Sequence, residues 1–365
     1  MLVSNFRNEM NDGVARAVAD VDGIPLWFES ADVKLVAAPE AYGSALLLPS
    51  QHRRRRLVLD APVSREWFAN ITGVLSIWGK WWGYHGLSPI CALSDENGAE
   101  ASTATGLCFS GGVDSFHSLV SDSRPNFLIA IQGFDIPLAD EVRMNGLRRS
   151  LTAAASFVGA TPVVVRTNLR EHPASGRPHL WERSHGGALA AVGHVLSSTI
   201  GKLLISSTYS INRNRKWGSS VQTDHLFSSS VMSIVHFGTA PREEKIRSIS
   251  MLPLAREHLR VCWENRTVQG NCSRCAKCTL VMLHLAEYGV LEEFRVFDGK
   301  DELASRLDSI PYLRTHVAVL ERAVARRRLE PRLQAAAARL LSRSQRAFHL
   351  NRLRNSLSSF ADRYV

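Results

Sequence analysis

The sequence predicts an α/β fold in which a parallel sheet carries helices on both faces. Three observations support this prediction. Apolar strand-like runs alternate with helix-like stretches between residues 101 and 300, a pattern typical of parallel sheets. Short segments bounded by Gly, Pro or Asp in residues 1–100 predict a β-rich N-terminal module. Strong helix formers in residues 301–365 predict a helical C-terminal extension.

The N-terminal module contains several expected elements. Strands are expected at residues 24–29, 33–37, 45–48 and 57–59, where apolar or alternating runs end at Gly, Pro or Asp. A packed helix is expected at 67–82, because this segment holds four of the eight tryptophans and has apolar residues at helical spacing. Residues 94–105 are rich in Ser, Ala, Thr and acidic side chains, so we expect a linker there.

From residue 106 onward, strands and helices are expected to alternate. We predict strands at 127–133, 161–165 and 202–206, and helices at 140–158 and 186–198. Ligands of such sheets bind outside the carboxyl ends of the strands, near the point where the strand order reverses. The loops that follow the predicted strands are therefore where a site is expected.

The most informative loop joins the apolar run Leu107–Phe109 to a stretch with helical spacing. It reads Ser110-Gly111-Gly112-Val113-Asp114-Ser115. Adjacent glycines allow backbone N–H groups to approach an anion, and the start of a helix adds partial positive charge. Ser110 and Ser115 supply hydroxyl donors, and Asp114 supplies a carboxylate that could hold Mg²⁺. The alternative is an ordinary glycine turn between a strand and a helix.

A second polar segment, residues 209–224, is too long for a simple connector. It carries Arg213, Arg215 and Lys216, which either meet a phosphate or substrate carboxylate or simply face solvent. No Ser-His-Asp or Cys-His nucleophile arrangement is evident from the sequence.

Four cysteines late in the chain have the spacing C-x9-C-x2-C-x2-C. They are Cys262, Cys272, Cys275 and Cys278. Four thiolates match the tetrahedral demand of a structural Zn²⁺ and leave no position open for a water molecule. Such a metal can contribute on the order of 10 kcal/mol to folding at neutral pH. An iron–sulfur cluster is the rival interpretation, since four thiolates suit either.

The charge and apolar content limit the partners and the location. The chain carries a formal charge of +10, and the segment 321–365 has eleven Arg against three acidic residues, which is 11 − 3 = +8. We therefore expect any contact with a nucleic acid or protein partner at this tail, or else a solvated basic face. No membrane span is expected, because the stretch 186–205 is interrupted by His194 and Lys202. Cytoplasm is the expected location, and a homodimer is a reasonable default.

The loop Ser110–Ser115 resembles the signature of the N-type ATP pyrophosphatases, the PP-loop family. Together with the late cysteines, it resembles 7-cyano-7-deazaguanine synthases over about residues 105–290. No Gly-Lys pair is followed by Ser or Thr, so the P-loop of γ-phosphate-transferring enzymes is absent. The N-terminal module and the C-terminal extension are not part of the compact synthase.

The resemblance implies a set of site residues. It makes Ser110, Asp114 and Ser115 catalytic and Cys262, Cys272, Cys275 and Cys278 zinc ligands. Asp224 lies where the family has an aspartate in a polar loop. The expected ATP- and Mg²⁺-binding residues are Ser110, Gly111, Gly112, Val113, Asp114, Ser115, Arg213, Arg215 and Asp224.

The resemblance also implies an activity: an ATP-dependent carbon–nitrogen ligase. It would adenylate a small-molecule carboxylic acid with release of pyrophosphate, and ammonia or an amine would then displace AMP to give an amide or, after a second adenylation, a nitrile. Two alternatives stay open. One is an adenylating sulfurtransferase that acts on a nucleobase or tRNA with an iron–sulfur cluster. The other is a non-catalytic nucleotide-binding partner protein.

Overall fold

The computed structural model describes residues 1–94, 101–176, 178–211, 215–267, 270–313 and 317–361. The chain divides into two compact units, Met1–Pro241 and Arg242–Val365. The boundary falls inside the segment 101–300 that the sequence suggests as one domain, and residues 1–94 share a unit with the segment that follows them. Residues 95–100 of the expected linker lie outside the described part of the chain.

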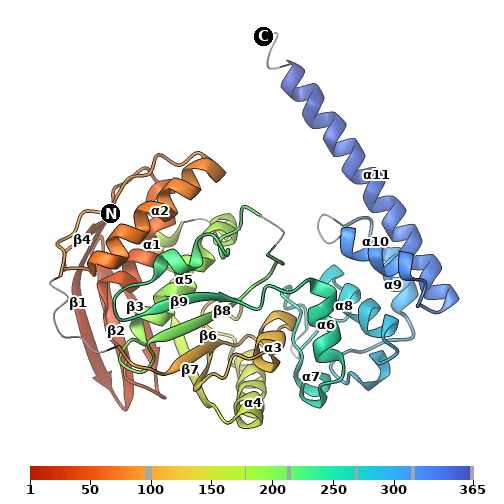
Figure 1. The fold of residues 1–365 in the computed structure, drawn as a ribbon, viewed down its shortest axis with the longest axis horizontal. Coiled ribbons are helices and arrows are strands. Elements are labelled where there is room, and N and C mark those ends of the chain that lie inside the picture. The colour runs from red at the N-terminus through yellow and green to blue at the C-terminus, as the bar shows by residue number, and fades with distance from the viewer. Residues whose placement is uncertain (95–100, 177, 212–214, 268–269, 314–316, 362–365) are drawn as a thin grey trace. The chain divides into compact units, whose positions relative to one another are not determined.

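The first unit is built on a nine-stranded sheet in the order β4-β1-β2-β3-β7-β6-β5-β8-β9 (Figure 1). Its strands are β1 (Leu2–Asn11), β2 (Val14–Val21), β3 (Ile24–Ser30), β4 (Val58–Leu59), β5 (Thr105–Cys108), β6 (Phe127–Gln132), β7 (Thr161–Thr167), β8 (Lys202–Ser206) and β9 (Ser233–Phe237). The five strands from β7 to β9 are parallel, whereas β1, β2 and β3 form an antiparallel meander. The large, mostly parallel sheet confirms the α/β prediction at this level.

The antiparallel meander is joined directly to the parallel strands. Phe28 of β3 pairs with Thr167 of β7, and Glu29 pairs with Arg166. Asn168, just beyond β7, accepts a hydrogen bond from the backbone N–H of Trp27 through its side chain at 3.0 Å. The N-terminal residues therefore extend the sheet of the following segment and do not form a separate layer.

Strands β1 and β2 were not anticipated from the sequence, although their turns carry a recognisable signal. Asp12-Gly13 and Asp22-Gly23 each place two consecutive residues at positive φ, between 48° and 86°. Two residues at positive φ form the tight turn whose twist matches that of antiparallel strands, and Asp-Gly is a preferred sequence for it. The two turns explain why three successive segments fold back on one another.

Two of the strands expected in the first hundred residues are wrong. The run 45–48 lies in α1 (Pro39–His52), in which every residue from Ala41 to Gln51 is buried. A helix that is buried all round lacks the polar face that reveals helical periodicity, so a short apolar run within it resembles a strand. Residues 33–37 form no ladder, and the backbone N–H of Val36 donates to the carbonyl of Val195 at 2.9 Å.

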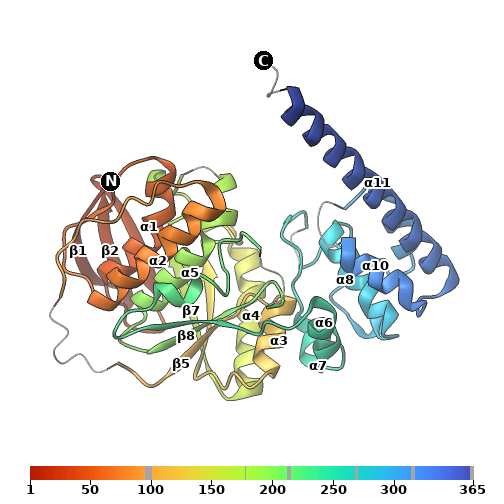
Figure 2. The ribbon, with the colours of Figure 1, turned by 45° about the horizontal axis from the view of Figure 1, so that its top comes forward.

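The other helices of the first unit follow the predicted alternation. They are α2 (Arg65–Trp82), α3 (Val113–Val120), α4 (Glu141–Val158) and α5 (Trp181–Val195). Helices α1, α2 and α5 lie on one face of the sheet, and α3 and α4 lie on the other (Figures 1 and 2). The main core fills the space between the sheet and α1, α2 and α5, and it includes the fully buried Trp67 and Trp78.

The second unit is helical. It contains α6 (Arg242–Ser250), α7 (Pro253–His258), α8 (Ala276–Glu287), α9 (Leu303–Ser309), α10 (Val317–Arg326) and α11 (Pro331–Ala361). The helical extension expected over residues 301–365 contains α9, α10 and α11, and α11 packs against α9 and α10. Among the described residues, no helix combines the length and apolar character needed to cross a membrane.

Candidate nucleotide site and metal centre

The loop Ser110–Ser115 lies between β5, the central one of the five parallel strands β7-β6-β5-β8-β9, and the start of α3. Gly111 has φ +71°, which L side chains rarely adopt, and Gly112 caps the helix with its carbonyl accepting from the N–H of Phe116 at 2.9 Å. The hydroxyl of Ser115 donates to the same carbonyl at 3.0 Å. Ser110 is exposed, and Asp114 in the first turn is partly exposed. The loop thus has the strand–turn–helix geometry of an anion-binding site.

This loop stands at the point where the strand order reverses. β5 pairs with β6 on one side and with β8 on the other, and all three are parallel. In an open parallel sheet, the crevice at such a switch point is the preferred ligand position. The registers Leu107↔Leu204 and Ile205↔His236 place the ends of β5, β8 and β9 along one edge. The end of β9 also lies close to α3, because a Cβ on Gly238, just after β9, would lie 2.8 Å from Ser118 Oγ.

A small pocket lies at the same edge, formed by the polar segment after β8 and the end of β9. Arg215 donates to the Tyr209 hydroxyl at 2.8 Å, and its guanidinium lies 5.1 Å from the centre of the same ring. Trp217 contacts Tyr209 edge to face, with ring centres 5.9 Å apart. The pocket is lined by Tyr209, Ser210, Ile211, Arg215, Trp217, Ser219, Ser220, Val221, His236 and Thr239.

The three cationic candidates of this segment differ in position. Arg215 borders the pocket, as an anion-binding residue would. Lys216 donates to the carbonyl of Trp81 at 2.9 Å and so ties the segment to the end of α2. Arg213 lies outside the described residues.

Asp224 lies beneath this pocket and not at its surface. The carboxylate is fully buried and accepts hydrogen bonds from the Ser219 hydroxyl at 2.7 Å and the Ser220 N–H at 3.0 Å. His236 Nδ1 lies 2.7 Å from Asp224 Oδ2, and His236 Nε2 lies 2.8 Å from Ser207 Oγ. These contacts hold the polar segment and orient His236, and a role of Asp224 in binding a cofactor stays a prediction.

The series Ser207–His236–Asp224 was missed at the sequence level. Its members come from the end of β8, from β9 and from the short 3-10 helix Asp224–Phe227. They are brought together by the parallel pairing of β8 with β9, in which Ser206 lies opposite Phe237. No local spacing signals such a pairing, because it depends on the sheet register.

The charge of Asp224 contributes to the pKa of two neighbouring groups. Burial, with Asp224 as a second cause, raises the pKa of the Cys108 thiol to about 12, so this cysteine is an unreactive thiol at neutral pH. Burial lowers the pKa of His185, although its hydrogen bond with the Trp181 carbonyl and the charge of Asp224 oppose the change. Neither group is suited to act as a nucleophile or a cation here.

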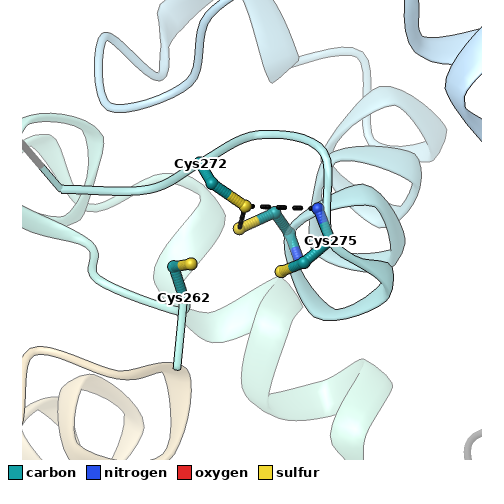
Figure 3. A group of neighbouring side chains, drawn as sticks. Cys262, Cys272 and Cys275 are labelled. Atoms are coloured by element: carbon teal, nitrogen blue, oxygen red, sulfur yellow. Dashed lines mark hydrogen bonds between the residues drawn. The ribbon is translucent and has the colours of Figure 1, made fainter. Parts of the chain in front are cut away.

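The four late cysteines come together in the second unit. Their Sγ atoms all lie within 4.8 Å of one another, and all four side chains are buried. Figure 3 shows the sulfur atoms of Cys262, Cys272 and Cys275 turned toward one another. Cys272 Sγ and Cys278 Sγ are 3.9 Å apart. A tetrahedral Zn²⁺ with Zn–S bonds of about 2.3 Å would place its sulfur ligands roughly 3.8 Å apart. The residues therefore fit a single metal ion such as zinc.

Backbone N–H groups donate hydrogen bonds to two of the cysteine sulfur atoms. The N–H of Cys275 donates to Cys272 Sγ at 3.2 Å, and the N–H of Cys278 donates to Cys275 Sγ at 3.4 Å. Hydrogen bonds from the thiol and the backbone of Cys278 lower the pKa of the Cys275 thiol to about 5, against an opposing effect of burial. A thiolate at this position is the ligand form that a metal requires.

Side chains next to the cysteines hold their loops in place. Asn271 accepts from the N–H groups of Val261 and Cys262 at 2.7 and 3.1 Å, and it donates to the carbonyl of Leu259 at 2.8 Å. Arg306 of α9 donates to the Ser273 carbonyl at 2.8 Å. His284 is buried, and its Nδ1 lies 3.3 Å from Glu287 Oε2.

Several arginines of the basic tail, residues 321–365, make contacts inside the second unit. Arg326 donates to the buried Glu287 at 3.0 Å, and Arg339 pairs with Asp308 at 2.6 Å. Arg343 donates to the carbonyls of Leu307 and Ile310, each at 2.9 Å, and so caps the end of α9. These arginines stabilise the packing of α9 to α11, which leaves fewer of them for an external phosphate.

Comparisons with known proteins are uninformative about function. No family model matches this sequence, and no curated protein matches it. The chain has a faint structural similarity to a type III CRISPR defence DNA nuclease activated by cyclic oligoadenylate, with a TM-score of 0.22 and 10% identity. The match covers 88% of this chain and 57% of the nuclease chain. A likeness this low carries no argument about fold or activity.

Proposed function

We propose that this protein is an ATP-dependent ligase of the PP-loop type, which adenylates a carboxylic acid and then forms a carbon–nitrogen bond. The observation that carries the proposal is the position of Ser110–Ser115 at the switch point of a parallel sheet, between the central strand and a helix start. This position suits the phosphates of ATP, because backbone N–H groups and the helix dipole both favour an anion there. The pocket beside it holds Arg215 and two aromatic rings, which suit an anionic organic substrate.

In this proposal the residues act by position and charge. The N–H groups of Gly111 to Ser115 hold the phosphates, with Asp114 near a Mg²⁺ that accompanies ATP. The substrate carboxylate attacks the α-phosphorus, and pyrophosphate leaves. Ammonia or an amine then displaces AMP from the acyl group. Such a reaction needs little covalent chemistry from the protein, because placement and charge stabilisation supply most of the rate.

The metal centre supports the ligase over the sulfurtransferase alternative. An iron–sulfur cluster inserts several iron and sulfide atoms between its cysteines, so its ligands stand farther apart than those of a single ion. The sulfur separations of at most 4.8 Å therefore favour one ion with a structural role. Metal analysis of the purified protein tests this point: zinc without iron or acid-labile sulfide is the expected result.

The products formed from ATP test the activity itself. With α-labelled ATP, Mg²⁺, ammonium and a panel of carboxylic acids that includes 7-carboxy-7-deazaguanine, we expect AMP and pyrophosphate in an acid-dependent reaction. Release of ADP and phosphate would contradict the proposal. D114N should reduce the rate at least about 100-fold, as loss of a metal-positioning group does. The matched control is D122N, because Asp122 is an exposed acid beyond the end of α3 that pairs with Arg124.

The same variants address the non-catalytic alternative. If the protein binds the nucleotide without turnover, the wild type should bind ATP but form no AMP. It would also show no difference in AMP formation between D114N and D122N.

A further inference from the structure

Three side chains form a continuous hydrogen-bonded series at the carboxyl edge of β8 and β9. Asp224 and Ser207 are fully buried, and the side chain of His236 between them is only 7% exposed. The two links measure 2.7 Å at Nδ1 and 2.8 Å at Nε2 of the imidazole. Asp224 is itself held by Ser219 and Ser220. A carboxylate, an imidazole and a hydroxyl at these distances are the parts of a proton-accepting system.

The hydroxyl of Ser207 can form a hydrogen bond with Nε2 of His236 whether or not that nitrogen carries a proton. Ser207 Oγ donates to the carbonyl of Tyr209 at 2.6 Å, and a hydroxyl has one proton but two acceptor lone pairs. When Nε2 carries no proton, Ser207 can rotate and donate to it. When Nε2 carries a proton, Ser207 accepts it and donates to Tyr209. Asp224 accepts from Nδ1–H in both states and stabilises the charge of a protonated ring.

The series lies beside the candidate nucleotide loop. Ser110 and Ser207 each lie three residues beyond the last pair of this ladder, Leu107↔Leu204, so both follow the carboxyl ends of adjacent parallel strands, β5 and β8. His236 also borders the pocket that contains Arg215 and Trp217. An acyl group activated at the loop would therefore have this series within its own crevice.

We propose that Ser207, His236 and Asp224 form a proton relay that activates the nitrogen nucleophile in the second half of the reaction. This inference rests on the proposed function. Ammonia forms a bond from nitrogen to the acyl carbon, and the bond from that carbon to the AMP oxygen breaks, with its electron pair leaving on AMP. One N–H proton passes to Ser207 Oγ while the proton of Ser207 passes to His236 Nε2. The imidazolium, paired with Asp224, then returns its proton to solvent.

Two half-reactions separate the relay from adenylation. The exchange of labelled pyrophosphate into ATP reports acyl-adenylate formation, and amide release reports attack by ammonia. The probes are 7-carboxy-7-deazaguanine, the other acids of the panel, ATP and ammonium.

The variants are H236N and S207A. H236N keeps a donor for Asp224 but cannot accept a proton at Nε2, and S207A leaves the contact between Asp224 and His236 in place. H225N is the matched control, because His225 is an exposed histidine beside Asp224.

We expect H236N and S207A to lower the rate of amide formation at least about 100-fold, the usual contribution of general base catalysis. Pyrophosphate exchange should stay within about twofold of the wild type. Hydroxylamine is a stronger nucleophile that depends less on a base, so hydroxamate formation should persist in both variants. H225N should match the wild type in every assay. If H236N does not fold, as judged by circular dichroism, S207A decides the question.

The contrary outcomes are distinct. Unchanged amide formation in S207A and a folded H236N would overturn the relay and leave adenylation intact. Equal loss of exchange and amide formation would also overturn it, because the residues would then serve only the structure of the pocket. An acyl group found on Ser207 by mass spectrometry would replace the relay with covalent catalysis. Absence of exchange in the wild type with every acid would overturn the proposed function and, with it, this inference.

Discussion

At the scale of single residues, two close approaches decide the geometry of the pocket edge. Gly186 of α5 faces the backbone of the polar segment, and a Cβ at this position would lie 2.0 Å from the carbonyl oxygen of Gly218. In turn, a Cβ at Gly218 would lie 2.6 Å from His185 Nδ1. Glycine at both positions allows the segment to sit directly on α5, and Ser219 and Ser220 then reach Asp224.

We expect G186A to destabilise the protein by about 1–3 kcal/mol, the usual cost of overpacking against the backbone. Urea denaturation with a constant m-value would measure this loss. The control is G146A in α4, where an added Cβ meets only the end of the Arg149 side chain at 3.9 Å. At that helix-interior site alanine should stabilise by about 0.5–1 kcal/mol. Equal effects of the two substitutions would contradict the close approach at Gly186.

A buried ion pair makes the second unit sensitive to acid. Burial of Glu287 opposes its ionisation, but hydrogen bonds from His284 and Arg326 outweigh burial and lower its pKa below the usual value of 4.5. A carboxyl whose pKa is lowered by folding stabilises the protein above its unfolded pKa, and the stabilisation is lost as the pH falls through the folded pKa. We therefore expect the unfolding free energy of this unit to fall as the pH drops below about 4.5.

The variant E287Q tests this effect. It should lose about 1.5–3 kcal/mol at pH 7, because a hydrogen bond to a charged group is weakened in the interior. Its stability should also change less between pH 5 and pH 3 than that of the wild type. E257Q is the control, since Glu257 is exposed and pairs with the exposed Arg295 at 3.6 Å. An equal pH response in wild type and E287Q would assign the acid sensitivity to other carboxyls.

At the scale of elements, the cysteine centre organises the start of α8. Cys275 is the N-cap residue of this helix, and Cys278 lies in its first turn. Around it, the side chains of Asn271 and Arg306 bind backbone groups of the cysteine loops. A metal bound by the four thiolates would join the loop of Cys262 to the start of α8.

Chelation of the metal should therefore unfold this part of the second unit. With a strong chelator, we expect residues 259–298 to lose protection from hydrogen exchange, because metal binding contributes on the order of 10 kcal/mol to such sites. C275S should show the same loss and should bind less than one metal ion per chain. C91S, at a half-buried cysteine of the first unit, should behave as the wild type. Full protection of this region after metal removal would contradict a structural role.

Apolar runs and helical spacing predicted most elements after residue 106, but they did not reveal the helix α1. The predicted strand 202–206 coincides with β8, and the helix expected at 140–158 is α4 with Asp140 as its N-cap, which accepts from the N–H of Arg143. In contrast, α1 packs against α5 and is buried from Ala41 to Gln51, so its sequence shows no amphipathic period. A helix is recognised by its amphipathic period only where one of its faces meets water.

At the scale of the whole molecule, the chain holds two compact units with separate folding requirements. The first has a large apolar core around Trp67, Trp78 and the sheet, and the second combines a smaller helical core with the cysteine centre. The charge excess is concentrated in the second unit, where Arg326, Arg339 and Arg343 already stabilise internal contacts.

We expect residues 1–241 to fold alone. This fragment contains all nine strands of the sheet and the helices that cover it, so its core needs no atom of the second unit. Circular dichroism should show native-like α/β content, and thermal unfolding should be cooperative. The fragment 101–300 is the matched comparison: it lacks the meander β1–β3 that pairs with β7, so we expect it to aggregate or to unfold without a cooperative transition. If fragment 101–300 unfolded cooperatively and fragment 1–241 did not, the result would favour the domain limits suggested by the sequence, with a domain over residues 101–300.

The sequence alone determined the α/β alternation, the strand–loop–helix at Ser110–Ser115 and the four cysteines as a group, because each depends on residues close together in the chain. Tertiary structure alone decided the rest: the meander that extends the sheet, the burial of α1, and the meeting of Ser207, Asp224 and His236. The reason is physical. Local spacing governs turns, helix starts and metal loops, whereas sheet register and packing join segments that no spacing in the chain relates.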